Sequence, residues 1–307
     1  MNYTLHQLQV FLKVTQTKSI TKAAEELHLT QPAVSIQLKN FQDQFEIPLT
    51  EVLGRKLYVT DFGKEIAIAA ENIINEVYAI NYKSQAFKGQ LYGRLKLSVV
   101  STGKYVMPYY LSKFMASNDE VELEMDVTNK VKVLKALKNN EIDFALVSIL
   151  PNDIQVESMP LMENKLFLVG NRSIDVNSNF DLKEYASMHP LIYRELGSAT
   201  RLSMENFLDK TGIIPNMKMQ LTSNEAVKQS VIAGLGLSIM PLIGLKNELE
   251  NGDIKIIPIH NLPLVSSWRL IWLKGKKLSP LAKAYLSFIN EFNDEIRKNH
   301  FNWINNY

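Results

Sequence analysis

The segment SITKAAEELHLTQPAVSIQLKNF, from Ser19 to Phe41, decides the fold of the first part of this 307-residue chain. Apolar residues recur in it with helical spacing in two short runs, which end at Leu27 and Phe41. Thr30, between the runs, is a good N-cap, and Pro32 suits the first turn of the second helix because that turn needs no amide donor there. The sequence therefore predicts two short helices joined by a tight turn.

This pattern is typical of a helix-turn-helix, in which the start of the second helix meets base edges in the major groove of DNA. An ordinary pair of packed helices would show the same spacing, so that alternative stays open on the pattern alone. Farther on, the segment LGRKLYVT from Leu53 to Thr60 predicts a hairpin with Gly54 at its turn, whose cations would contact phosphate. The residues that we expect to contact DNA are Thr30, Gln31, Pro32, Ser35, Ile36, Gln37, Lys39, Arg55 and Lys56.

A long helix is expected from Thr60-Asp61 to about Lys88, with a length of about 40 Å. Its apolar residues repeat every seven positions, which predicts a coiled-coil seam and a dimer. A helix that packs on its own domain is the alternative. The repeat consists of Ile66, Ile73, Ile80 and Phe87, with Ala70, Val77 and Ser84 four residues after the first three.

Two sets of segments carry a resemblance to a known family. LQVFLKVTQTKSITKAAEELHLTQPAVSIQLKNFQDQF resembles the DNA-binding domain of LysR-type transcriptional regulators in its alanine pair, its Gln-Pro, its Ala-Val-Ser and the lengths between them. In the second half, GRLKLSVVSTGKYVMP, NNEIDFALV, YRELGSATR, SNEAVKQSVIAGLGLSIMP and KKLSPLAKAYLSF resemble the effector domain of the CbbR/RbcR-like branch, which regulates carbon-fixation operons. The resemblance covers nearly the whole chain.

The chain departs from the family at a few positions of the DNA-binding module. Phe41-Gln42 stands where Leu-Glu is usual, and Thr50 and Val52 stand where Phe and Arg are usual. Ile36 occupies a position that is often polar or basic. One common phosphate contact of the hairpin is therefore expected to be absent, and the target sequence is expected to differ.

The resemblance implies an α+β multidomain architecture. It consists of a winged helix-turn-helix (residues 1–60), a linker helix for dimerisation (61–90) and a two-lobed α/β effector domain like periplasmic binding proteins (91–307). The pattern of the chain agrees, because strands and helices alternate after Gly89 and Gly93, which predicts parallel sheets with helices on their faces. We expect one lobe at about 91–164 and 266–307, and the other at about 165–265.

A ligand site is predicted from the strand ends, since ligands of open α/β sheets sit beyond the carboxyl ends of strands, at free helix amides. Hydroxyls, amides and two cations follow four of the expected strands, which favours a small anionic effector. Any one of these residues could instead be a simple helix cap, and Arg201 could form a structural ion pair. We expect Thr102 and Arg201 to face each other across the cleft. The expected effector-binding residues are Ser101, Thr102, Lys104, Ser148, Ser198, Thr200, Arg201 and Asn224.

Composition excludes several classes of function. The chain has no cysteine, which excludes disulfides and thiol chemistry, and its five histidines lack metal-ligand spacing. The formal net charge is only +2, and residues 1–90 carry nine basic and nine acidic residues, so strong non-specific DNA binding is not expected. The start of the chain resembles no signal peptide and no stretch suits a membrane span, so we expect a cytoplasmic location.

The sequence as a whole predicts a transcriptional regulator that senses a small anionic metabolite and controls transcription from operator DNA. We expect no enzymatic activity, no cofactor and no metal. The expected partners are double-stranded operator DNA, the effector, further copies of the chain as a homodimer assembling to a homotetramer, and RNA polymerase as a further candidate, but no membrane. The alternative is a two-lobed small-molecule-binding protein without a DNA-binding role.

Overall fold

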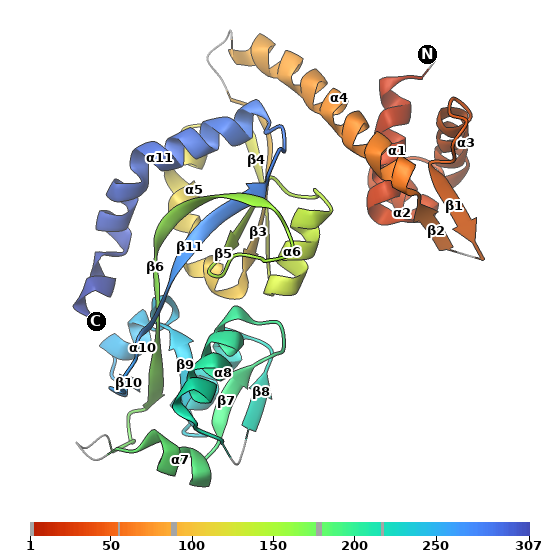
Figure 1. The fold of residues 1–307 in the computed structure, drawn as a ribbon. Coiled ribbons are helices and arrows are strands. Elements are labelled where there is room, and N and C mark those ends of the chain that lie inside the picture. Colours follow the sequence, from red (N-terminus) through yellow and green to blue (C-terminus); the bar gives the residue numbers. More distant parts are fainter. Residues whose placement is uncertain (1–2, 55, 87–90, 176–179, 216–217) are drawn as a thin grey trace. The chain divides into compact units, whose positions relative to one another are not determined.

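The computed structural model describes residues 3–54, 56–86, 91–175, 180–215 and 218–307 (Figure 1). Contacts divide the chain into two units, one of residues 1–92 with 277–283 and the other of residues 93–276 with 284–307. Each unit is described by itself below. Within the described residues, no helix is long and apolar enough to cross a membrane.

The first unit is built from four helices and a hairpin. Three helices precede the hairpin, in the order that the sequence predicts, and a long helix follows it. The hairpin is antiparallel, with Leu53 opposite Lys56 and Gly54 in the left-handed conformation at the turn, so its first strand begins earlier than the predicted Leu53. The elements are α1 (Leu5–Thr17), α2 (Ile20–Leu27), α3 (Gln31–Gln42), β1 (Thr50–Leu53), β2 (Lys56–Val59) and α4 (Asp61–Ala86).

An aromatic cluster holds the core of this unit. The ring of Phe41 is fully buried, and its centroid lies 5.0 Å from that of Phe11, 5.4 Å from that of Tyr3 and 5.2 Å from that of Phe45. Phe41 therefore contributes a large apolar area to the core at the end of α3, where the family usually has leucine.

The start of α4 is fixed by a cap and by a close approach of the backbone. The hydroxyl of Thr60 accepts a hydrogen bond from the amide of Gly63 at 2.9 Å and donates one to the carbonyl of Pro48 at 2.7 Å. A Cβ at position 63 would lie 2.0 Å from the carbonyl oxygen of Leu49, so only glycine fits. The predicted helix start at Thr60-Asp61 is confirmed.

One face of α4 belongs to the core of the first unit, which the seven-residue repeat did not predict. Ala70 and Ile74 are buried there, and Ile66 packs against the same cluster. Ile73 and Ile80 are 40% and 67% exposed. The predicted seam is thus partly corrected, because Ile66 and Ala70 face their own domain. Phe87 and the side chain of Ser84 lie outside the described residues.

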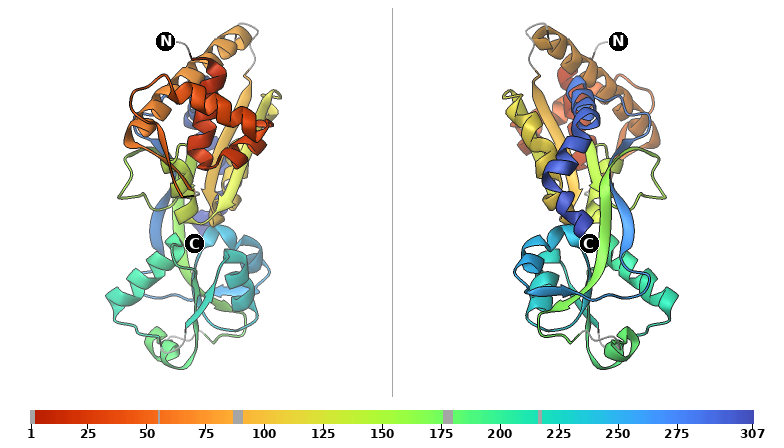
Figure 2. Two further views of the ribbon diagram at one scale, coloured as in Figure 1. Left: turned by 90° about the vertical axis from the view of Figure 1, so that its right-hand side faces the viewer. Right: turned by 90° about the vertical axis from the view of Figure 1, so that its left-hand side faces the viewer.

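The second unit has two lobes joined by two crossing strands, β6 (Val156–Asn171) and β11 (Leu264–Leu273). Figure 1 shows these strands running side by side from one lobe to the other, and both views of Figure 2 show the lobes joined through them. The first lobe holds β3 (Gly93–Val100), η1 (Ser101–Tyr105), α5 (Met107–Ala116), β4 (Val121–Thr128), α6 (Lys130–Lys138), β5 (Phe144–Val147), α11 (Pro280–His300) and η3 (Asn302–Asn306).

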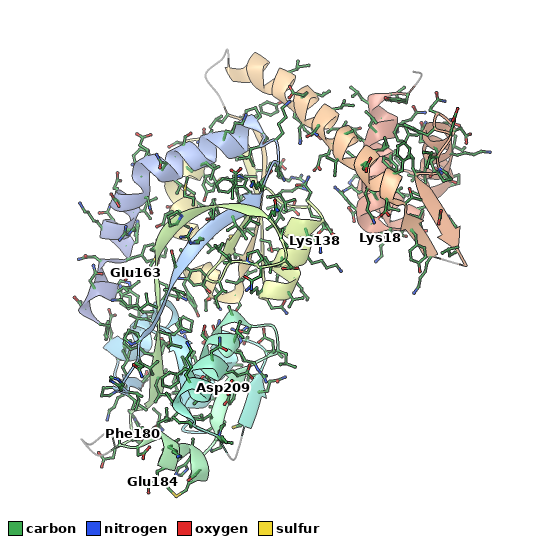
Figure 3. The ribbon with its side chains drawn as sticks, viewed as in Figure 1. Lys18, Lys138, Glu163, Phe180, Glu184 and Asp209 are labelled. Carbon is green, nitrogen blue, oxygen red and sulfur yellow. The ribbon has the colours of Figure 1, made fainter. Side chains whose placement is uncertain are left out.

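The second lobe is built around buried side chains of β6, β7 and β9, such as Leu168, Tyr193 and Ile239, and Figure 3 shows side chains filling its interior. Its elements are α7 (Leu182–Met188), β7 (Leu191–Arg194), α8 (Ala199–Thr211), β8 (Lys218–Leu221), α9 (Asn224–Ile232), β9 (Ser238–Pro241), η2 (Leu242–Gly244), α10 (Lys246–Glu250) and β10 (Ile254–Ile256).

The main sheet is mixed, whereas the alternation of strands and helices predicted a parallel one. Its order is β10-β6-β11-β5-β3-β4, with β9 also paired to β6. β3 is parallel to β4 and β5, but β11 is antiparallel to both β5 and β6, because these crossing strands pair directly with each other. In the second lobe, β7 and β8 form a separate parallel pair.

The β6–β11 pairing contains a bulge. Met162 lies opposite Trp268 and Pro160 lies opposite Arg269, so Leu161 has no partner residue on β11. The hydroxyl of Tyr110 lies 3.3 Å from the carbonyl oxygen of Leu161 and 2.8 Å from the side-chain oxygen of Asn293, and it shares its one proton between these two acceptors. The ladder between these strands is therefore interrupted at this point, where Pro160 also lacks an amide donor.

Candidate functional site

The outer face of α3 carries the predicted DNA-contacting side chains. Gln31, Ser35 and Lys39 are exposed, and Ile36 is 57% exposed. The opposite face packs into the core through Val34, Leu38 and Phe41, and the hydroxyl of Thr30 accepts from the amide of Ala33 at 3.4 Å as the predicted N-cap. Pro32 is exposed in the first turn and Gln37 is half-buried. The helix thus presents its polar side to a partner.

The hairpin offers one described cation beside this helix. Lys56 is exposed at the start of β2, while Arg55 lies outside the described residues. Val52 and Leu53 are 66% and 64% exposed. An apolar side chain thus occupies position 52, where the family usually has arginine.

Two departures from the family sequence meet in the structure. The side-chain oxygen of Gln42, at the end of α3, accepts hydrogen bonds from both the amide and the hydroxyl of Thr50 at the start of β1. These contacts tie the helix to the hairpin. The two unusual residues therefore form one structural pair.

In the second unit, three helix starts meet at a cleft between the lobes. α6 comes from the first lobe, and α8 and α9 come from the second. Free amides and the helix dipole make such positions favourable for anions. The cleft is lined by Val100, Ser101, Thr102, Asn129, Lys130, Ser148, Arg194, Ser198, Ala199, Thr200 and Asn224.

The lobes lie close together across this cleft. The cavity has a volume of about 20 Å³, which is room for about one water molecule. A Cβ at Gly197, whose φ is +87°, would lie 2.7 Å from Cγ2 of Val131 in the other lobe. The side-chain nitrogen of Asn224 donates to the hydroxyl of Ser101 at 3.1 Å, again from lobe to lobe. A metabolite therefore requires the lobes to move apart.

Six predicted residues line the cleft, and two do not. Ser101, Thr102, Ser148, Ser198, Thr200 and Asn224 are in the lining. Lys104 is outside it and lies over the ring of Tyr105, 5.0 Å from its centroid.

Arg201 differs most from its prediction, because it does not face Thr102. Its Nε donates to Glu205 at 2.8 Å, and its Nη1 donates to the carbonyl of Arg194 at 3.1 Å and to the side chain of Gln220 at 2.6 Å. It is a structural arginine of the second lobe, as the alternative in the sequence analysis allowed.

The structure adds two cations that the sequence reasoning missed. Arg194 is the last residue of β7 and is 5% exposed, and Lys130 follows Asn129 at the start of α6. Both lie at strand ends, Lys130 two residues after the end of β4 at Thr128 and Arg194 at the end of β7. Burial lowers the pKa of Lys130, and the nearby charge of Asp153 partly opposes this.

The roles of the polar residues at the helix starts can now be separated. Ser223 accepts from the amide of Ala226 at 3.0 Å, so it is a true cap. Ser198 is buried at the start of α8 but makes no capping hydrogen bond through its side chain. The side-chain oxygen of Asn224 is buried without a hydrogen-bond partner among the described residues. The side-chain oxygen of Asn224 is thus a buried polar atom without a structural explanation, which suits a ligand site.

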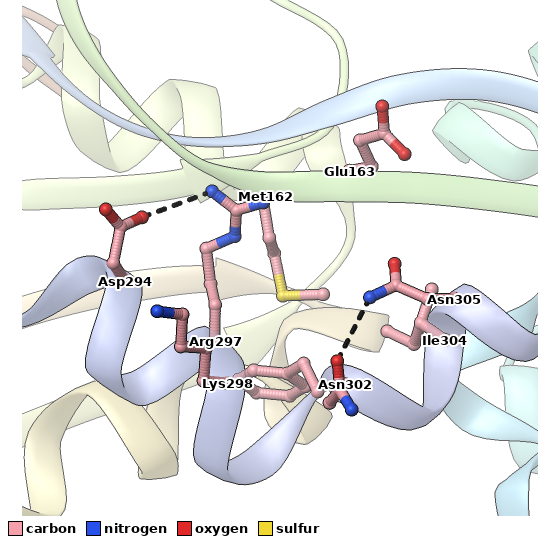
Figure 4. A pocket seen from close by; sticks show the side chains of 9 residues that line it. Met162, Glu163, Asp294, Arg297, Lys298, Asn302, Ile304 and Asn305 are labelled. Carbon is pink, nitrogen blue, oxygen red and sulfur yellow. Dashed lines mark hydrogen bonds and ion pairs between the residues drawn. The ribbon is translucent and has the colours of Figure 1, made fainter.

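A larger cavity of about 380 Å³ lies between β6 and the end of α11 (Figure 4). Four of its polar residues form two pairs: Arg297 lies 3.5 Å from Asp294, and the side-chain nitrogen of Asn305 donates to the side-chain oxygen of Asn302 at 3.2 Å. No α-helix start contributes to its described lining, and none of the predicted site residues does. The cleft between the lobes is therefore the better candidate. Among the residues that the structure describes, no cluster suited to a metal was found.

Comparisons with known families agree with this arrangement. The model described as "Bacterial regulatory helix-turn-helix protein, lysR family" matches residues 5–64, and that described as "LysR substrate binding domain" matches residues 88–294. The transcriptional activator CmpR of Synechocystis sp. is 34% identical over 94% of this chain and 95% of its own length. The RuBisCO operon transcriptional regulator of Allochromatium vinosum is also 34% identical, over 94% of this chain and 96% of its own length.

Solved structures are similar as well. The regulatory domain of Synechocystis CcmR, in complex with 2-PG, has a TM-score of 0.60 and 28% identity, covering 68% of this chain and 98% of that one. A full-length OxyR variant from Pseudomonas aeruginosa has a TM-score of 0.70 and 19% identity, covering 97% of this chain and 95% of that one. The latter supports the predicted fold over nearly the full length.

Proposed function

Because the chain belongs to the LysR family of bacterial transcriptional regulators, we propose that it binds operator DNA through α3 and the hairpin and responds to a small anionic metabolite in the cleft. The alternative of a binding protein without a DNA-binding role is set aside, because the helix-turn-helix of the family spans residues 5–64. A DNA-binding regulator acts where the chromosome is, so the proposed location is the cytoplasm.

The observation that carries the effector site is the meeting of three helix starts with Lys130, Arg194 and buried hydroxyl groups that cap no helix. Thr102 and Ser198 are buried at the cleft from opposite lobes, and neither caps a helix through its side chain. Lys130 and Arg194 add positive charge from opposite lobes. The arrangement favours a phosphate or carboxylate group, and the 2-PG complex of the CcmR regulatory domain makes 2-PG the first compound to test.

The proposed mechanism begins with the tie between the lobes. Asn224 and Ser101 hydrogen-bond across the cleft, and a ligand must open this contact and replace it. The lobes then change their separation, which alters how the copies in a homodimer or homotetramer present their α3 helices to DNA.

The test combines ligand binding with DNA binding. The melting temperature of the wild type should rise with 2-PG, and this shift should shrink strongly in Thr102→Val and Ser198→Ala, because hydrogen bonds to a charged ligand contribute about 1.5–3 kcal/mol each. Both variants should still retard DNA from upstream of their own gene in a gel-shift assay. Ser223→Ala is the matched control, since it removes only a cap and should keep the full ligand shift. Full ligand shifts in both cleft variants would refute this assignment of the sensor.

A further inference from the structure

Arg194 and Glu195, at the end of β7, form a buried ion pair at the edge of the cleft. The Nε and Nη2 atoms of Arg194 donate to the two carboxylate oxygens of Glu195 at 2.8 and 2.9 Å. The side chains are 5% and 14% exposed. Arg194 lines the cleft, and Glu195 does not. The carboxylate of Glu195 thus binds the Nε–Nη2 edge of the Arg194 guanidinium from outside the cleft lining.

This pairing leaves Nη1 of the Arg194 guanidinium for a ligand and fixes the orientation of the side chain. Nη1 of Arg194 makes no hydrogen bond within the described part of the chain, while the carbonyl of Arg194 accepts from Arg201 at 3.1 Å. Arg201 is in turn held by Glu205 and Gln220. The main chain and the side chain of Arg194 are therefore both held in place.

The pair also sets the charge of the cleft. Arg194 and Glu195 together are neutral, and the described lining of the cleft contains no acidic residue. Lys130 is therefore the main cationic side chain of the lining, and the nearby charge of Asp153 offsets it only partly. The starts of α6, α8 and α9 each add about half a positive charge. The cleft thus presents a charge of roughly +2 to +3 by this count, whereas an unpaired Arg194 would add one more.

We propose that Glu195 is a specificity-determining residue, which matches the cleft to anions of about two to three negative charges and disfavours more highly charged ones. This inference rests on the proposed function of the cleft. The ligand class that fits is a phosphomonoester, alone or with one carboxylate. A bisphosphate exceeds the charge that the cleft balances, because each additional ligand charge is repelled by the Glu195 carboxylate.

The experiment compares two inorganic probes of different charge, phosphate and pyrophosphate, on the full-length protein at constant ionic strength. Titration calorimetry gives the ratio of their affinities. In Glu195→Gln, this ratio should shift towards pyrophosphate by at least tenfold, because the repulsion acts on every charge of the ligand. Glu195→Asp keeps the charge but shortens the side chain, so it should weaken both probes and leave the ratio near that of the wild type. Glu122→Gln removes an exposed carboxylate that is paired to Arg94 outside the cleft lining, and it should leave both affinities unchanged.

The outcomes separate this inference from the proposed function. An unchanged ratio in Glu195→Gln overturns the inference, provided that Thr102→Val and Lys130→Gln weaken phosphate binding and so place the anion in the cleft. If those two variants bind both probes and 2-PG like the wild type, the proposed function of the cleft fails as well. A ratio shift that Glu122→Gln reproduces would show a general effect of charge and would also overturn the inference.

Discussion

Helix α4 offers the sharpest test of assembly, because neighbouring isoleucines lie in different environments. Ile73 is 40% and Ile80 is 67% exposed, so their uncovered surface amounts to about one isoleucine side chain per protomer. Burying an isoleucine fully contributes about 1.5–3 kcal/mol. Two protomers would then gain about 3–6 kcal/mol from these positions, or a factor of about 10²–10⁴ in the dissociation constant.

The double variant Ile73→Glu with Ile80→Glu should therefore raise the dissociation constant of the dimer by at least that factor, as sedimentation velocity over a dilution series would measure. The control is Ile74→Glu, because Ile74 is buried in the core of its own unit. That variant should unfold the DNA-binding unit, which a lost thermal transition would reveal, whereas the double variant should keep it folded. A double variant that dimerises like the wild type would refute a seam along this helix.

Three further predictions concern single contacts. Gln31→Ala should weaken operator binding by about 1–3 kcal/mol in a gel-shift titration, and Lys39→Ala should lower the slope of log affinity against log salt by about one; unchanged operator selectivity in Gln31→Ala would contradict the docking of α3. Gln42→Ala leaves the amide and hydroxyl of Thr50 without their acceptor and should cost about 1–3 kcal/mol in denaturant unfolding of the DNA-binding unit. Burial raises the pKa of Asp143 despite nearby lysines, so its contribution to stability is present below about pH 4 and is lost as the pH rises through the folded-state pKa. Asp143→Asn should therefore stabilise the effector domain more at pH 7 than at pH 4, and equal melting shifts at both pH values would contradict this.

Local signals predicted the DNA-binding module well. Thr30 and Thr60 were identified as caps because a cap depends on only three or four neighbouring residues. The sequence does not decide which face of α4 is buried in its own unit. Ile66, Ala70 and Ile74 follow a spacing of four, whereas Ile66, Ile73 and Ile80 follow a spacing of seven. One helix can satisfy both patterns, and only the tertiary structure shows that the first is buried.

The cleft was predicted in position but not in every side chain. Strand ends indicated Thr102 and Ser198, since the carboxyl ends of the strands are recognisable in the sequence. The role of Arg201 could not be predicted from the sequence, because one of its partners is Gln220, which lies nineteen residues farther along the chain on strand β8. The strand-end rule does not indicate Arg194, because this residue is the last one of β7 and the rule selects the residues of the loop after the strand.

The bulge in the β6–β11 pairing has a mechanical consequence. Ten residue pairs join these strands, so they cannot separate without breaking a long ladder of hydrogen bonds. Relative motion of the lobes is therefore expected to twist the pair of strands β6 and β11 while their pairing is kept. We expect this twist to occur mainly at the bulge, where Leu161 lacks a partner on β11 and Pro160 lacks an amide donor. The hydroxyl of Tyr110, on α5 of the first lobe, lies 3.3 Å from the carbonyl oxygen of Leu161, so the first lobe contacts the two crossing strands at the bulge.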